Sequence, residues 1–245
     1  MEETAKNRLI HCITNPVSMN QCANTILSLG AKPIMAEHPD EVTEITKTAS
    51  SLLLNLGNIT DARITSMRLA LREANSTGIP VTLDAVGVAC SSLRKTLAKL
   101  LMTFGRFTVI KGNYSEIIAL YDDTYKSAGV DAKEGTDVER VKNAALELAK
   151  ANNAIVVATG KVDLIASAGE ITSVEGGVAQ MSQVTGTGCM LGAVIATYLA
   201  EKKDAQSVAD ACRFFKRCGE KAQTDKGNGT FMVNLLDAIG GSHEL

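Results

Sequence analysis

The chain has 245 residues, of which 45% are hydrophobic and 21% are charged, and its formal net charge is −2 at pH 7. This is the composition of an ordinary globular protein, and it lacks the basic surface that nucleic acids or anionic membranes attract. Aromatic residues make up 4% of the chain and tryptophan is absent, so the stacking platforms of single-strand binders are missing. We therefore expect no nucleic acid and no membrane as partner.

The same sequence predicts a cytoplasmic location. No apolar run approaches the ~20 residues that a membrane-spanning helix needs. The first residues, "MEETAKNRLIHC", are charged and do not have the apolar core of a secretory signal. Six cysteines are scattered without C-x-x-C spacing, which favours small buried reduced thiols over disulfides or a metal site.

Apolar runs and helical patterns alternate along the chain, which indicates α/β layers around one sheet. A strand is predicted over residues 9–15. The helix that follows is expected to begin with a capping box of Ser18 and Gln21 and to end at Gly30. Residues 32–37, "KPIMAE", are predicted to form the next strand.

Residues 51–57, "SLLLNLG", form a continuous apolar run, which predicts a strand buried on both faces. A helix follows, with Ile64, Met67 and Leu71 on one face, and Gly78 is expected to end it. Two further buried strands are predicted at 79–87 and 106–113.

The second half of the chain begins with a polar, breaker-rich stretch, 122–136, which is predicted to be a surface loop. A helix is expected over 137–153, with Val141 and Leu148 on its apolar face. Three short apolar runs within 154–174 have the spacing of a β-meander. The remaining helices are predicted at 190–202, 205–222 and 230–239.

These elements predict a single domain with a mostly parallel sheet and an antiparallel edge. In open sheets of this kind, ligands bind beyond the carboxyl ends of the strands. Met35, at one of these ends, is by its residue type more often a core side chain than a ligand contact. The strand ends that deserve inspection are Asn15, Met35, Gly57, Asp84, Lys111–Asn113 and Thr159.

Residues 183–192, "QVTGTGCMLG", place a glycine-rich turn before an apolar helix. Glycines allow the backbone to approach a ligand closely, and a helix N-terminus favours negative charge. The turn is therefore a candidate anion site, although the spacing matches neither a P-loop nor the dinucleotide fingerprint. An ordinary strand-to-helix turn around a small buried residue explains the same letters.

Cys189 stands where this turn enters the helix. A helix N-terminus can lower the pKa of a thiol below its usual value of about 8.5. The position therefore makes Cys189 a candidate general base or nucleophile. The alternative is a small buried hydrophobe, which is the interpretation that we give to the other five cysteines.

Other strand ends carry polar groups suited to phosphate and metal chemistry. In "IKGNYSE", Lys111 could contact phosphate, and Glu116 could hold Mg²⁺ through water; Asn113 and Glu116 also have the spacing of a capping box. Asp84 ends a buried strand, where an unpaired carboxylate would be costly, and so favours a metal or phosphate role. Thr159 offers a hydroxyl beside a glycine, which is also common turn material.

Seven blocks of the sequence resemble the hydroxyethylthiazole kinase family of the ribokinase-like superfamily. They occur in order between residue 11 and about residue 239, and together they are highly specific. The blocks are "HCITNPVSMNQCANTILSLGAKPIMAEHPDEV", "LLLNLG", "LDAVGV", "VIKGNYSEI", "VVATGKVDLI", "QVTGTGCMLGA" and "GNGTFMVNLLDAI".

The resemblance implies a ribokinase-like three-layer αβα domain over 1–245, with no separate lid domain. It implies transfer of the γ-phosphoryl group of ATP to the alcohol of 4-methyl-5-(2-hydroxyethyl)thiazole, with Mg²⁺ as cofactor. It also implies a homotrimer with the thiazole site at the subunit boundary. By the same resemblance, Asn15, Met35 and Gly57 would frame the thiazole, and Gly186 would lie near its hydroxyethyl arm.

For the phosphoryl side, the resemblance implies that Lys111 and Thr159 contact ATP and that Asp84 and Glu116 organise Mg²⁺. The catalytic group would be Gly186, Gly188 and Cys189, with the last two forming the anion hole and holding the reacting alcohol. Sugar kinases of the superfamily have an aspartate base at the place of the cysteine.

Two positions depart from the family pattern. Lys111 stands where the family usually has arginine, which keeps the charge but loses the bidentate fork. Ala85 replaces the usual proline after Asp84. The sequence leaves open a related vitamin or hydroxymethylpyrimidine kinase, and also a thiazole-binding regulator without catalysis.

Overall fold

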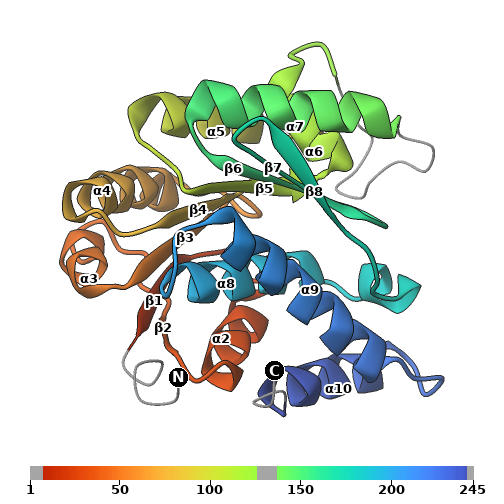
Figure 1. Cartoon of the computed structure of the whole chain (residues 1–245). Coiled ribbons are helices and arrows are strands. Elements are labelled where there is room, and N and C mark those ends of the chain that lie inside the picture. Colours follow the sequence, from red (N-terminus) through yellow and green to blue (C-terminus); the bar gives the residue numbers. More distant parts are fainter. Residues whose placement is uncertain (1–7, 126–136, 242–245) are drawn as a thin grey trace.

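The structure, a computed structural model, describes residues 8–125 and 137–241. An eight-stranded sheet lies at its centre, in the order β2-β1-β3-β4-β5-β6-β7-β8 (Figure 1). Neighbouring strands are parallel from β2 to β6, and β7 and β8 add an antiparallel edge, as the sequence predicts. The strands are β1 (Leu9–Ile13), β2 (Lys32–Ile34), β3 (Ser51–Asn55), β4 (Val81–Asp84), β5 (Val109–Asn113), β6 (Ile155–Thr159), β7 (Asp163–Ser167) and β8 (Glu170–Val174).

Helices cover both faces of the sheet, which gives the expected three layers. In β3, Leu52 and Leu54 pack into the core on the side of α4 to α7, while Leu53 packs on the side of α2 and α8. Because both faces are covered, all five residues of β3 are buried. The helices are α2 (Met19–Ser28), α3 (Val42–Thr48), α4 (Asp61–Thr77), α5 (Ser92–Phe104), α6 (Tyr114–Tyr121), α7 (Val138–Asn152), η1 (Ala179–Gln183), α8 (Thr187–Leu199), α9 (Ala205–Ala222) and α10 (Asn228–Gly240).

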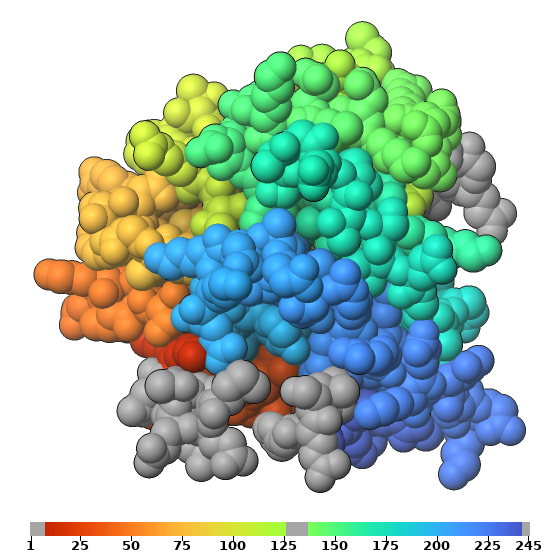
Figure 2. Space-filling model, in the orientation of Figure 1, coloured from red at the N-terminus to blue at the C-terminus, as the bar shows by residue number. Residues whose placement is uncertain are grey.

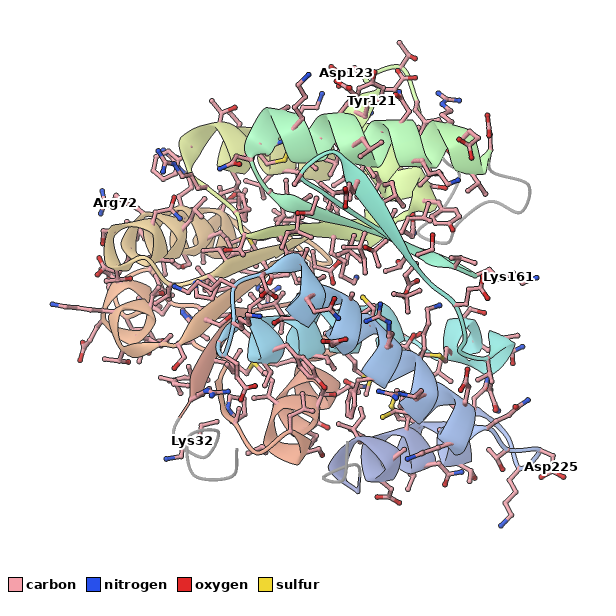
Figure 3. All side chains as sticks on the ribbon, in the orientation of Figure 1. Lys32, Arg72, Tyr121, Asp123, Lys161 and Asp225 are labelled. Carbon is pink, nitrogen blue, oxygen red and sulfur yellow. The ribbon has the colours of Figure 1, made fainter. Side chains whose placement is uncertain are left out.

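In the space-filling view, the C-terminal part of the chain, coloured blue, covers the lower front of the molecule (Figure 2). Labelled charged side chains such as Arg72 and Asp225 point outward at the periphery (Figure 3). Of the helices in the described part of the chain, none has both the length and the apolar character needed to cross a bilayer.

Several predicted helix ends are confirmed. Gly78 ends α4 with φ +71°, as predicted; the N-cap of this helix, Thr60, which accepts from the Arg63 N–H, was not predicted. Asn113 and Glu116 form the expected capping box at the start of α6. The three runs of the predicted meander are β6, β7 and β8.

Other boundaries are corrected. β2 ends at Ile34 instead of extending to residue 37. Ser18 is the N-cap of α2, but its side chain makes no capping bond, and its ψ of 4° departs from the extended backbone usual at this position. The Ser18 N–H, which Gln21 would hold in a capping box, donates instead to Asn15 Oδ1 at 3.1 Å. The sequence analysis did not predict α3 and α5. Most of the predicted loop 122–136 lies outside the described residues, which omit 126–136.

Helix α8 begins at Thr187, three residues before the predicted start at 190. Its N-cap is Gly186, whose φ of +97° is in the region that favours glycine. This earlier start places Gly188 and Cys189 in the first turn of the helix. The difference bears directly on the chemistry of the glycine-rich turn.

Candidate active site

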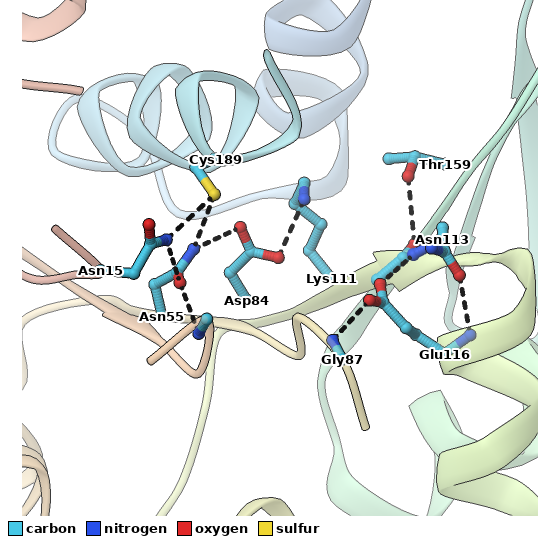
Figure 4. A network of polar contacts seen from close by, with 11 residues as sticks. Asn15, Asn55, Asp84, Gly87, Lys111, Asn113, Glu116, Thr159 and Cys189 are labelled. Atoms are coloured by element: carbon cyan, nitrogen blue, oxygen red, sulfur yellow. Dashed lines mark hydrogen bonds and ion pairs between the residues drawn. The ribbon is translucent and has the colours of Figure 1, made fainter. Parts of the chain in front are cut away.

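The carboxyl ends of four neighbouring strands bring polar side chains together beneath the N-terminus of α8 (Figure 4). Asn15 follows β1, Asn55 ends β3, Asp84 ends β4 and Lys111 lies near the end of β5. In the sheet, Asn55 is the register partner of Asp84, which is in turn the partner of Lys111. Parallel pairing therefore places residues from four distant segments side by side.

Asp84 and Lys111 form a buried ion pair. Lys111 Nζ lies 2.9 Å from Asp84 Oδ1, and the two side chains are 4% and 0% exposed respectively. Burial raises the pKa of Asp84, against the effect of the ammonium and the Asn55 amide. Burial alone would lower the pKa of Lys111, but Asp84, Cys189 and Glu116 together raise it, which keeps this residue cationic.

Asn55, which the sequence analysis missed, joins the parts of this site. Its Nδ2 donates to Asp84 Oδ2 at 2.9 Å and to Cys189 Sγ at 3.3 Å. Its Oδ1 accepts from Asn15 Nδ2 at 2.9 Å and from the Gly57 N–H at 2.8 Å. The available signal was a single amide at the end of the apolar run "SLLLNLG".

Gly57 makes room for the two asparagine side chains. A Cβ at this position would lie 2.6 Å from Asn15 Nδ2 and 2.9 Å from Asn55 Oδ1. A side chain here would therefore displace both amides. Met35, just beyond β2, is half-buried against the apolar cluster that contains Cys189.

The environment of Cys189 corrects one prediction. Its Sγ accepts from Asn15 Nδ2 at 3.4 Å as well as from Asn55, and the residue is 8% exposed. Burial raises the pKa of this thiol, and the nearby Asp84 carboxylate raises it further. The expectation that the helix N-terminus lowers it is wrong, because the carboxylate and the loss of solvent outweigh the dipole. Cys189 is a neutral thiol at pH 7.

The other cysteines are free thiols as expected, with one difference. Cys12, Cys22, Cys212 and Cys218 are buried, but Cys90 is exposed. Cys90 Sγ donates to the Gly87 carbonyl at 3.3 Å, and the N–H of the same glycine donates to Glu116 Oε1.

Space for a ligand lies beside Gly188. Outside the backbone of α8 and the neighbouring residues, a Cβ at Gly188 would have one heavy atom within 4 Å, Lys111 Nζ at 4.0 Å. Gly186 is tighter, since its Cβ would be 3.2 Å from the Ser18 side chain. The N–H groups in the first turn of a helix have no acceptor inside the helix, and they carry the positive end of its dipole. The open space at Gly188 is thus bounded by amide hydrogens and an ammonium group.

Glu116 lies on the other side of Lys111 with Asn113 and Thr159 (Figure 4). Its two oxygens accept from the Gly87 and Asn113 N–H groups, each at 2.7 Å. Burial raises the pKa of Glu116 to about 7, against these two bonds. Thr159 is the register partner of Asn113, and its hydroxyl donates to the Gly112 carbonyl at 3.3 Å.

The donor set fits Mg²⁺ held through water. Asp84 and Glu116 are buried carboxylates, and the charge of Asp84 adds to the effect of burial in raising the pKa of Glu116. Each of their four oxygens already accepts a bond from the protein, which favours outer contacts over direct ligation. Within residues 8–125 and 137–241, no group of three His, Cys, Asp or Glu side chains could hold a metal directly.

The fold places the protein in a broad structural class. The three-layer α/β fold is similar to that of a ribokinase-like superfamily protein from Enterococcus faecalis V583 (TM-score 0.68, 15% identity, 98% of this chain and 89% of that chain). The likeness supports a ribokinase-like fold.

The particular family follows from closer matches. The model of the hydroxyethylthiazole kinase family matches residues 2–242. Hydroxyethylthiazole kinase 2 of Clostridium botulinum strain Langeland is 42% identical over 243 residues, covering 96% of this chain and 90% of its own. The hydroxyethylthiazole kinase structure from Pyrococcus horikoshii OT3 has a TM-score of 0.88 at 31% identity, over 98% of this chain and 91% of that chain. The chain belongs to the hydroxyethylthiazole kinase family.

Proposed function

We propose that the site beneath α8 transfers the γ-phosphoryl group of ATP to the alcohol of 4-methyl-5-(2-hydroxyethyl)thiazole. Kinase activity in thiamine metabolism follows from the family, and the roles of individual residues are our proposal. The observation that carries it is the open space at Gly188, which the first turn of α8 and Lys111 Nζ border, with Cys189 as the next residue of the helix.

The thiazole side of the site is formed by Asn15, Met35 and Gly57. Gly57 is supported in this role because its missing side chain allows the Asn15 and Asn55 amides to meet. The hydroxyethyl arm would pass Gly186, and its hydroxyl would reach Cys189 at the start of α8. The two amide contacts fix the sulfur in place for this purpose.

The phosphate side is formed by Lys111, Thr159 and the amides at Gly188 and Cys189. Phosphoryl transfer requires positioning and charge stabilisation more than covalent chemistry from the protein. An ammonium and several amide hydrogens around one space meet this requirement. Asp84 and Glu116 would hold Mg²⁺ through water, and this ion would neutralise charge on the ATP phosphates.

Cys189→Ala is expected to lower kcat by at most about 100-fold and to leave measurable turnover. General base catalysis contributes 10²–10⁴-fold in enzymes, and a thiol with a raised pKa lies at the low end. Steady-state kinetics with saturating ATP measure the effect. The control is Cys22→Ala, which removes a buried sulfur of the same size from the adjacent helix. A Cys189→Ala protein that binds ATP but does not turn over would contradict this ranking.

Glu116 is expected to make kcat/KM fall at acidic pH, which gives the pH–rate profile an acid limb. Its carboxyl is ionised above about pH 7 and takes up a proton below it, so kcat/KM for Mg-ATP should fall about tenfold per pH unit below this pKa. Glu116→Gln should be less active, and its rate should not vary over the same range. Glu139→Gln changes an exposed glutamate and should keep the limb. If kcat/KM of Glu116→Gln still fell below pH 7 as in the parent protein, the titrating group would be another residue.

The direct test is incubation with Mg-ATP and the thiazole alcohol, followed by mass spectrometry for the phosphate ester. A parallel reaction with hydroxymethylpyrimidine separates this substrate from that of a related vitamin kinase. Phosphorylation of the pyrimidine alone would replace the proposed substrate. Binding of the thiazole with no ATP consumption would point to a regulator.

The homotrimer with the site at the subunit boundary is also a proposal. It is supported by Val17, an apolar side chain that is 62% exposed between Asn15 and the start of α2. A partner subunit that covered Val17 would close the thiazole side. Light scattering should give three times the mass of one chain, and a monomer that is fully active would rule out a shared site.

A further inference from the structure

Lys216, in helix α9, is a buried cation outside the site described above. The residue is 7% exposed, and its ammonium lies among four oxygens. Three are the carbonyls of Gly160, Lys161 and Gly176, at 3.3, 3.3 and 3.2 Å. The fourth is Asp163 Oδ1 at 3.4 Å, in a side chain that is 4% exposed.

These oxygens belong to two segments that Lys216 ties to α9. One is the turn between β6 and β7, which begins directly after Thr159. Asp163 closes this turn by accepting from the Gly160 N–H at 3.0 Å. At Lys161 the backbone carbonyl faces the ammonium while the side chain points outward (Figure 3). The turn is thus oriented by its backbone.

The second segment leaves β8 at Gly176 and Gly177. Lys216 donates to the Gly176 carbonyl, and Glu220, one helical turn further along α9, accepts from the Gly177 N–H at 2.8 Å. A single face of α9 therefore holds both polar atoms of the peptide group that joins Gly176 to Gly177. The same face fixes the turn after Thr159.

Tyr114 holds the turn from the opposite side. Its hydroxyl donates to the Val162 carbonyl, and its ring occupies the place where a Gly160 Cβ would lie, 2.6 Å from the ring carbon that bears the hydroxyl. Tyr114 directly follows Asn113, the register partner of Thr159. The turn is therefore clamped between the start of α6 and helix α9.

Burying an ammonium is costly, and an apolar residue of similar length would often be less so. The three carbonyls and the Asp163 carboxylate offset this cost only while the β6–β7 turn and the segment after β8 keep their positions against α9. We infer that Lys216 is a positioning residue for the nucleotide, which holds Thr159 and the following turn in the place where ATP phosphates bind. The inference rests on the proposed contact between Thr159 and ATP.

Lys216→Met, which keeps the chain length but removes the charge, tests it. ATP dissociation constants, measured by calorimetry, are expected to rise about tenfold, while those for the thiazole alcohol stay within twofold. The matched control is Arg213→Met, one turn before Lys216 on α9. This change breaks the exposed ion pair between Arg213 and Asp210. This control should change neither constant. Unchanged ATP binding in Lys216→Met, or equal weakening for both ligands, would overturn the inference.

Asp163→Asn decides the question if Lys216→Met does not fold. The amide oxygen can still accept from the Gly160 N–H, but the ammonium loses its counter-charge. A selective loss of ATP affinity supports the inference, and no loss rejects it. Thr159→Val separates the two proposals. If it leaves ATP affinity unchanged, the assignment of Thr159 is wrong; if it weakens ATP binding while the Lys216 and Asp163 variants do not, only the positioning role fails.

Discussion

Gly188→Met is expected to reduce phosphoryl transfer by at least about 10³-fold while the protein stays folded. The new side chain would fill the space beside Lys111 Nζ and cover the amide hydrogens of the first turn of α8. Loss of one such donor already costs 10²–10³-fold in other enzymes, and here the whole group would be blocked. Single-turnover kinetics, with ATP binding measured in parallel, give the effect.

Stability should not fall with this activity. Gly188 has no positive φ, its Cβ would meet no backbone of another segment, and methionine is a better helix former than glycine. Gly229→Met is the matched control, since Gly229 is likewise the second residue of its helix and has open space around its Cβ. A Gly188→Met protein with normal turnover would show that phosphate binds elsewhere.

Asp84→Asn is expected to lower the free energy of unfolding by about 3–5 kcal/mol and to reduce activity by about 10²–10³-fold. The substitution leaves the Lys111 ammonium buried without its counter-charge, and breaking a buried pair in this way is strongly destabilising. It also removes one of the two carboxylates proposed to hold Mg²⁺. Urea unfolding at pH 7 and steady-state kinetics measure the two losses.

A double variant separates these two effects. Asp84→Asn combined with Lys111→Met removes both charges, and it should recover most of the stability but none of the activity. Asp210→Asn breaks an exposed pair on α9 and should cost no more than about 1 kcal/mol. If the double variant were as unstable as Asp84→Asn, the ion pair would not be the source of the loss.

Much of the fold could be predicted because local patterns agree with tertiary structure. The run at 51–57 predicts a buried strand, and Gly78 ends its helix where expected. The candidate positions Asp84 and Lys111 could be found because parallel strands place their carboxyl ends at one edge. The sequence argument for Asp84 assumed an unpaired charge, and the structure supplies its partner in the next strand.

What could not be predicted depends on side chains from distant segments. Burial raises the pKa of Cys189, and the carboxylate of Asp84, about a hundred residues earlier in the chain, raises it further. Asn55 was missed because its four hydrogen bonds reach three other segments besides its own turn. The capping box of Ser18 and Gln21 is absent because the Ser18 N–H donates to Asn15, a contact within the turn that the spacing does not show.

The exposed thiol at Cys90 provides a handle for spectroscopy. The other five sulfurs are buried, so a maleimide dye should attach at this one position in the folded protein. Cys90 contacts the Gly87 carbonyl, and the N–H of the same glycine holds Glu116. A fluorophore there would be linked to the Glu116 carboxylate through Gly87. Its emission should therefore change on addition of Mg-ATP if Glu116 holds the metal as proposed, and no residue of the proposed site is altered.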